Sequence, residues 1–192
     1  MGLLIAGLAI LLGVHSIAIV APATRARLRE RLGDGGWKGL YGVIALIGFV
    51  MMVYGFGLAR QAPIVVYTAP RWLRHIAFLL MLPVFPLLLA AYLPGRIKTA
   101  AKQPMLAAVK FWALAHLLAN GLLADVLLFG GFLAWAVVDR ISLKRRPASS
   151  ATPPGAPPGR FNDVIAVLLG LALYAFFIAW AHLELFGVSP LA

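Results

Sequence analysis

The sequence predicts an all-α, polytopic membrane protein: a bundle of six transmembrane helices with both termini on the outer, periplasmic side. Hydrophobic residues make up 62% of the 192 residues and charged residues 12%, and the mean hydropathy is +0.94. Such a composition is typical of a chain that is dissolved in lipid. The basic residues, in addition, are concentrated in a few short segments between apolar stretches. There is no cysteine, which excludes disulfides, thiolate ligands and cysteine nucleophiles.

Six apolar segments follow one another along the chain, and most are close to the roughly 20 residues needed to cross a bilayer. Pro83 and Pro86 lie inside the third segment and should kink it. The fourth and fifth segments are shorter, and only Asn120 and Gly121 separate them. Asn-Gly is a good helix stop, because both residues tolerate left-handed backbone angles. The six predicted spans are residues 3–21, 39–59, 73–93, 105–119, 122–138 and 164–186.

The distribution of basic residues predicts the orientation of these spans. The loops 22–38, 94–104 and 139–163 hold 13 of the 17 Lys and Arg residues. Because cytoplasmic loops are enriched in such residues, six spans with both termini outside are needed to place all three loops in the cytoplasm. The net charge of +11 thus reflects topology, and no nucleic-acid partner is expected. Residues 1–192 are predicted to form a single domain, with a proline-rich cytoplasmic loop at about 145–160.

Two histidines interrupt apolar segments, His15 in the first and His116 in the fourth. An imidazole inside a bilayer needs a hydrogen-bond partner, a metal or a cofactor. At about 1.5 Å per residue, His15 is about 15 Å from Arg25 and His116 about 18 Å from Pro104. Both counts start at the predicted cytoplasmic face, so both imidazoles are expected near the bilayer centre. Two ligands at one level suit haem b, although hydrogen bonds from each histidine to a neighbouring helix remain the structural alternative.

Other residues in or near the spans are expected either to support the histidine site or to lie at the membrane surface. Trp112 and Asn120 lie four residues to either side of His116 and share its helical face, where Trp112 could pack on a bound ring and Asn120 could hydrogen-bond near the ligand. Four further ionisable residues are expected near the outer surface: His75, Asp125, His182 and Glu184. Imidazoles and carboxylates could together form a metal or proton site, but they are also ordinary residues at a membrane interface.

An ordered set of short motifs resembles the NnrU family of bacterial membrane proteins, over essentially the whole chain outside the proline-rich loop. NnrU proteins are associated with denitrification and nitric oxide metabolism. The family is similar to the plastid zeta-carotene isomerase, a membrane haem b enzyme, and this resemblance implies His15 and His116 as axial ligands and a bacterial inner membrane location. The motifs are Gly13-Val-His-Ser16, Trp37-Lys-Gly-Leu-Tyr41, Gln103-Pro-Met105, Trp112-Ala-Leu-Ala-His116, Asn120-Gly121 and Phe186-Gly-Val-Ser-Pro-Leu191.

The resemblance implies a haem b protein of redox or nitrogen-oxide metabolism, with an apolar molecule or a small gas as ligand. Ala113 stands where the isomerase has a cysteine, and Gln103 stands where a histidine is often found, so no thiolate can exchange on the iron. A non-catalytic membrane assembly or regulatory factor with structural histidines is the alternative. A haem-dependent cis-trans isomerase of polyene lipids is the third interpretation. The sequence leaves open whether the protein is an enzyme.

Overall fold

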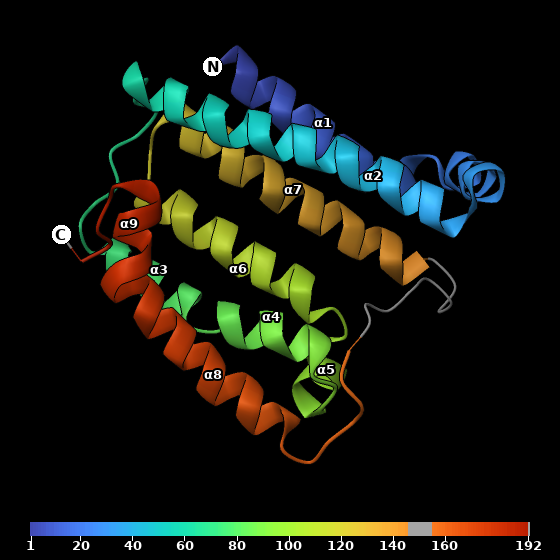
Figure 1. Ribbon diagram of the computed structural model, residues 1–192. Coiled ribbons are helices and arrows are strands. Elements are labelled where there is room, and N and C mark those ends of the chain that lie inside the picture. Colours follow the sequence, from blue (N-terminus) through green and yellow to red (C-terminus); the bar gives the residue numbers. More distant parts are fainter. Residues whose placement is uncertain (146–154, 192) are drawn as a thin grey trace. The chain divides into compact units, whose positions relative to one another are not determined.

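The computed structural model describes residues 1–145 and 155–191. Within these ranges the regular structure is helical, apart from one isolated antiparallel bridge between Val65 and Leu122. The helices are α1 (Gly2–Val20), α2 (Pro22–Gln61), α3 (Leu73–Met81), α4 (Val84–Tyr92), α5 (Arg96–Ala101), α6 (Pro104–Ala119), α7 (Leu123–Arg145), α8 (Asn162–Phe176), the π-helix η1 (Phe177–Ala181) and α9 (His182–Phe186). Figure 1 shows their order along the chain.

Every apolar segment predicted from the sequence coincides with helical structure. Five helices, two of them counted across short interruptions, are long and apolar enough to cross a membrane: Gly2–Val20, Pro22–Gln61, Leu73–Tyr92, Leu123–Arg145 and Asn162–Phe186. The helix α6 is apolar but has 16 residues, fewer than the others. The all-helical class is confirmed, while the sixth span and the orientation of the termini stay predictions.

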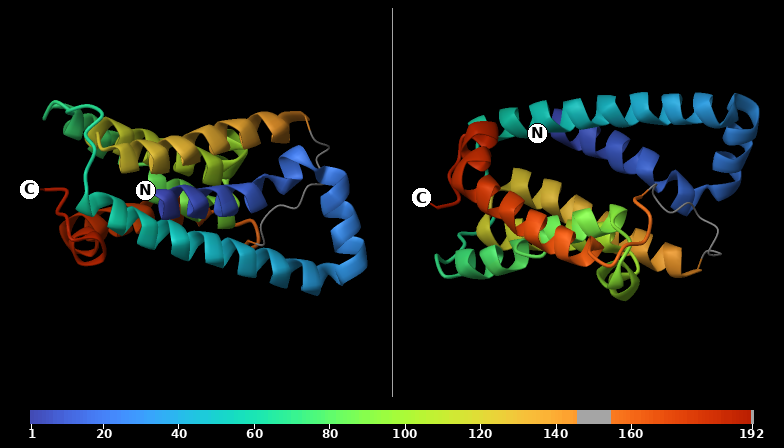
Figure 2. Two further views of the ribbon diagram at one scale, coloured as in Figure 1. Left: turned by 90° about the horizontal axis from the view of Figure 1, so that it is seen from above. Right: turned by 60° about the horizontal axis from the view of Figure 1, so that its bottom comes forward.

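The chain divides into two compact units. Unit 1 consists of Met1–Ala69 and Asn120–Arg145, and unit 2 of Pro70–Ala119 and Arg146–Ala192. Within unit 1, α1 packs along α2 and also contacts α7; within unit 2, α4 contacts both α6 and α8 (Figure 2). The prediction that residues 1–192 form one domain stays a prediction.

Close backbone contact joins α1 and α2 in unit 1. A Cβ atom added to Gly48 would lie 2.7 Å from the backbone nitrogen of Leu11, and one added to Gly55 would lie 2.6 Å from the Cα atom of Leu4. Small residues of this kind let membrane helices approach closely. Gly48 and Gly55 therefore permit the close contact, whereas Gly57 of the same helix faces open space.

The Asn120-Gly121 break between α6 and α7 is confirmed, and a neighbouring loop stabilises it. The carbonyl of Gly121 accepts hydrogen bonds from the backbone N–H groups of Val66 and Tyr67, at 2.8 and 3.2 Å. Leu123 N–H donates to the carbonyl of Ile64 at 2.8 Å. A Cβ atom at residue 121 would meet the Tyr67 carbonyl, so glycine is required here for space. Neither Asn120 nor Gly121 has a positive φ, so the break does not use the left-handed angles on which the prediction relied.

Interrupted helices characterise unit 2. The predicted kink in the third segment is confirmed as a break at Leu82–Pro83 between α3 and α4. Near this break the Tyr174 hydroxyl of α8 donates to the carbonyl of Phe78 at 2.8 Å. The proline-rich loop falls partly outside the described residues; its residues 155–159 carry no regular structure.

Candidate functional site

His15 lies in the second half of α1 and its ring is tethered to its own helix. The Nδ1 atom is 2.7 Å from the carbonyl oxygen of Leu11, one turn earlier. Because a carbonyl oxygen can only accept, Nδ1 carries the proton, and the lone pair of the neutral ring is on Nε2. Ligating histidines are commonly oriented in this way by a backbone carbonyl.

Aromatic rings from two other helices of unit 1 surround His15. The ring of Tyr41 of α2 lies 5.2 Å from the His15 ring, and that of Trp135 of α7 lies 5.9 Å away, edge to face. The ring of Trp37, buried on α2, is tilted against that of Tyr41, with the ring centroids 6.0 Å apart. The three helices of this unit thus converge on one imidazole.

Trp135 carries an unusual donor. Among the residues that the structure describes, its Nε1 is the one buried side-chain nitrogen or oxygen without a hydrogen-bond partner. A buried unsatisfied N–H costs free energy, about 1–3 kcal/mol, and it calls for an explanation such as a bound group. The donor lies next to the imidazole that the sequence selected as a ligand.

His116 lies near the end of α6 in unit 2 and is held in the same manner as His15. Its Nδ1 is 2.8 Å from the carbonyl oxygen of Trp112, so the proton is again on Nδ1 and the lone pair on Nε2. The Trp112 ring packs against the His116 ring at 5.5 Å. Asn120 follows the last residue of α6, and its backbone carbonyl accepts a hydrogen bond from the Tyr67 hydroxyl at 2.6 Å.

The outer residues show varied environments. His182 donates from Nδ1 to the carbonyl of Val188 at 2.7 Å and directly follows the π-helix, whereas His75 and Glu184 are exposed. Asp125 is 6% exposed and accepts the Leu122 N–H at 3.2 Å at the start of α7. In residues 1–145 and 155–191, no three His, Asp or Glu side chains gather as a metal-binding group.

The helix ends revise the depth count for His15. The count assumed a helix that continues to Arg25, but α1 ends at Val20 and the chain turns at Ala21 into α2. His15 is therefore five residues, or about 7.5 Å, from the end of its helix. His116 is twelve residues, or about 18 Å, from Pro104 at the start of α6, as predicted. The matched depth of the two histidines now depends on where each helix end lies in the bilayer.

These features define a class: a helical membrane protein with several apolar spans and two histidines, each oriented by a backbone carbonyl of its own apolar helix. The NnrU protein family model matches residues 3–190. The chain therefore belongs to the NnrU family, as the motifs predicted. The searches of curated proteins and of solved structures found no match.

Sequence reasoning missed two residues of this candidate site, Tyr41 and Trp135. Tyr41 ends the Trp37–Tyr41 motif, so a signal was present without an assigned role. The chain has five tryptophans. Trp135 lies in an apolar segment, and its spacing from other residues does not indicate a place in the site. Its place beside His15 follows from the contact of α1 with α7.

Proposed function

We propose that the protein is a six-span inner-membrane haem b protein, with His15 and His116 as axial ligands, that serves redox or nitrogen-oxide metabolism. One histidine comes from each unit. The proposal requires that both reach a single iron. The predicted orientation, with both termini outside and the three basic loops in the cytoplasm, is part of this proposal.

The single observation that carries the proposal is the shared tether of the two imidazoles. Each ring has its Nδ1 bonded to the carbonyl four residues earlier, which fixes the tautomer that presents Nε2 as the ligating nitrogen. Two neutral imidazoles are a donor set that fits haem iron. The unpartnered N–H of Trp135 supplies a hydrogen-bond donor for a cofactor or its ligand beside His15.

When bound, haem would supply one-electron chemistry and, once an axial position opens, binding of a small gas. The residues of the chain would do the rest. His15 and His116 would hold the iron, and because no cysteine is present, the chain has no thiolate that could replace either imidazole. Trp135 would donate to an acceptor near His15. An isomerase mechanism in which a thiolate replaces a histidine on the iron is not supported, because the position of that cysteine is occupied by Ala113, which is fully buried.

The runner-up function is a non-catalytic assembly or regulatory factor. The tether also favours this interpretation, because a hydrogen bond to the backbone satisfies one nitrogen of a buried imidazole without any cofactor. His182 also has its Nδ1 at a backbone carbonyl, that of Val188 six residues later, whereas His15 has in addition the ring of Trp135, with its unpartnered Nε1, beside it. Removing histidines one at a time separates the two functions.

The test is the absorption spectrum of the purified full-length protein produced in cells supplied with a haem precursor. We expect a Soret band, and we expect His15→Ala or His116→Ala to lose or shift it, since each removes an axial ligand. The matched controls His75→Ala and His182→Ala should keep the band unchanged. A colourless protein favours the structural function, and loss of the band in His182→Ala would move the second ligand from His15 to His182.

The topology is tested separately. Single cysteines at Ala69 and Ala100, in a chain with none of its own, should react with an impermeant maleimide from opposite sides of the membrane. Ala69 lies in the predicted outer loop and Ala100 in a predicted cytoplasmic one. Labelling of both from the same side would contradict the six-span arrangement.

A further inference from the structure

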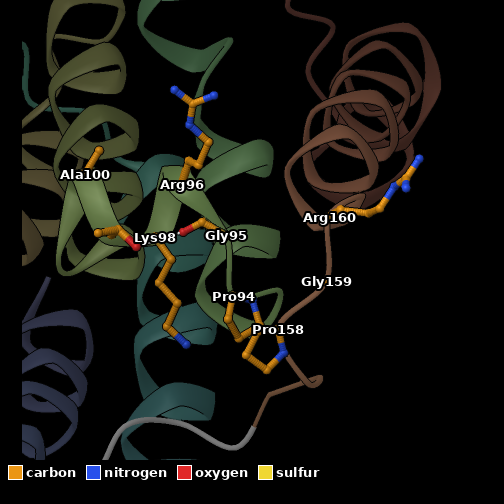
Figure 3. Close-up of a pocket in the computed structure, with 9 residues that line it drawn as sticks. Pro94, Gly95, Arg96, Lys98, Ala100, Pro158, Gly159 and Arg160 are labelled. Atoms are coloured by element: carbon orange, nitrogen blue, oxygen red, sulfur yellow. Dashed lines mark hydrogen bonds between the residues drawn. The ribbon is translucent and has the colours of Figure 1, made fainter.

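A basic hollow lies at one end of unit 2, where α4 meets α5 and the chain enters α8. Its volume is about 820 Å³, and its walls are formed by the segments 94–100 and 158–160. Figure 3 shows these two segments facing each other across the hollow. The volume is in the range typical of sites for small molecules.

Specific hydrogen bonds hold the two walls together. The side-chain amide of Asn162, which is 8% exposed, donates to the carbonyls of Pro94 and Pro157 at 2.8 and 3.1 Å. Ala156 N–H donates to the carbonyl of Tyr92 at 2.8 Å. The hollow is thus a structured corner.

The charges around the hollow are unbalanced. Arg96, Lys98 and Arg160 line it, and none of them pairs with a carboxylate in the described part of the chain. Lys98 Nζ donates to the carbonyl of Ala91 at 2.8 Å, and the Arg160 guanidinium lies 4.5 Å from the centroid of the Phe161 ring, so both cations keep their charge without a counter-ion. Asp163, the neighbouring acid, accepts the backbone N–H groups of Arg96 and Ile97 at 2.8 and 3.0 Å. Figure 3 shows the three basic side chains pointing away from one another at the rim, so they contribute positive charge around the hollow and do not converge on one point.

An apolar groove begins beside this hollow. It has a volume of about 290 Å³ and is lined by Asp163, Val164, Val167 and Leu168, which share one face of α8. Val164 and Leu168 are 51% and 64% exposed. Asp163 joins the two features, because it lines the groove and hydrogen-bonds Arg96 at the hollow. A basic site at the end of an apolar, exposed helix face matches the two chemical parts of a phospholipid.

We propose that the hollow and the groove together bind one anionic phospholipid. The headgroup lies at the hollow, where Arg96, Lys98 and Arg160 supply positive charge that attracts anionic lipid by about 1 kcal/mol per basic residue near a membrane surface, and an acyl chain follows Val164 and Leu168 along α8. Basic pockets at the cytoplasmic ends of transmembrane helices recognise anionic lipid headgroups by this combination. The site is independent of the haem proposal, since it uses neither His15 nor His116.

The experiment measures lipid contact at α8 in the full-length protein. A bimane label at Leu168→Cys reports quenching by phosphatidylglycerol with brominated acyl chains, diluted into phosphatidylcholine bilayers. The control label is at Leu58→Cys, an exposed position on α2 of unit 1. We expect phosphatidylglycerol to be preferred at residue 168 over residue 58 by at least about fivefold, the factor for one favourable basic contact at a membrane surface.

Two further arms identify the source of the preference. The triple variant R96Q/K98Q/R160Q should abolish it, whereas R25Q/R27Q/R31Q, which removes the same charge from another basic segment, should leave it unchanged. Equal quenching at both labels, or a preference that survives in R96Q/K98Q/R160Q, would overturn the proposal. Relief of quenching by millimolar inorganic phosphate would show instead that the hollow is a site for free anions.

Discussion

The two units hold their helices together in different ways. In unit 1, α1 and α2 meet at glycines, with Gly48 and Gly55 of α2 against the backbone of α1. In unit 2, helices are interrupted, and polar side chains such as Asn162, Asp163 and Tyr174 bond to backbone groups near the interruptions. Lipid offers no hydrogen bonds to freed backbone groups, so a unit with broken helices needs these side chains, and a unit of long helices can rely on close contact.

The packing of unit 1 also determines the surroundings of His15. Rings from two other helices, Tyr41 and Trp135, lie next to His15, because the close contact of unit 1 brings them within reach. Changes in the packing of unit 1 should therefore affect His15 strongly.

The largest expected effect is at the glycine contact of unit 1. Gly55→Leu places a side chain where the backbone of Leu4 lies, and overpacking of this kind should cost about 3 kcal/mol or more. Gly57→Leu, two residues away with open space around it, should cost little. Unfolding in mixed micelles with rising dodecyl sulfate measures both. Equal destabilisation by the two variants would contradict the close contact.

The next effect is at the polar corner of unit 2. Asp163→Ala removes the acceptor of two backbone N–H groups at the start of α5, with an expected loss of about 2 kcal/mol. Glu184→Ala, which removes an exposed carboxylate, is the matched control and should change stability by less than about 0.5 kcal/mol. The same unfolding assay applies. A stable Asp163→Ala protein would show that unit 2 does not depend on this bond.

A smaller effect concerns the donor beside His15. Trp135→Phe keeps an aromatic ring and removes the N–H, so it should weaken cofactor binding by about 1 kcal/mol, roughly fivefold in Kd, and shift the reduction potential. Trp72→Phe, at an exposed position, should alter neither. Haem titration and potentiometry measure both quantities. An unchanged potential and Kd in Trp135→Phe would leave its N–H without a role in the site.

Much of the helical structure could be predicted from the sequence because apolar length and helix-breaking residues act locally. The helix stop at Asn120-Gly121 and the break at Pro83 are properties of single residues, and both are confirmed. The predicted end of the first span at residue 21 agrees with the end of α1 at Val20, but the sequence did not indicate that the basic segment after it forms the start of α2.

The candidate site was predictable only in part. His15 and His116 stand out because imidazoles are rare in apolar segments, whereas Trp135 became visible only through the contact of α7 with α1. Aromatic residues are common in any membrane span, so their role depends on which helices meet, and the sequence pattern does not specify that.

The smallest expected effect is at the bend of α2, outside the membrane-spanning segments. Gly33 has a φ of +69° and breaks the regular helix, and across it Arg29 Nε lies 2.6 Å from Asp34 Oδ1. The hydrogen bond and charge of Arg29 hold the pKa of Asp34 below its usual value. The folded pKa is depressed, so the contribution of the pair is complete above the unfolded pKa of about 4 and is lost as the pH falls through the folded pKa. Both groups are exposed, so salt should weaken the pair.

Spin labels at Ala23→Cys and Leu46→Cys report the angle of this bend. At pH 6 we expect a narrow distance distribution, and at a pH below the folded pKa of Asp34 a broader one, because protonated Asp34 no longer holds Arg29. Asp34→Asn, which cannot ionise, should give the broad distribution at both pH values, and Glu30→Gln, which removes a nearby exposed charge, should behave as the parent protein does. If Asp34→Asn keeps the narrow distribution at pH 6, the geometry of Gly33 alone sets the bend and the ion pair only accompanies it.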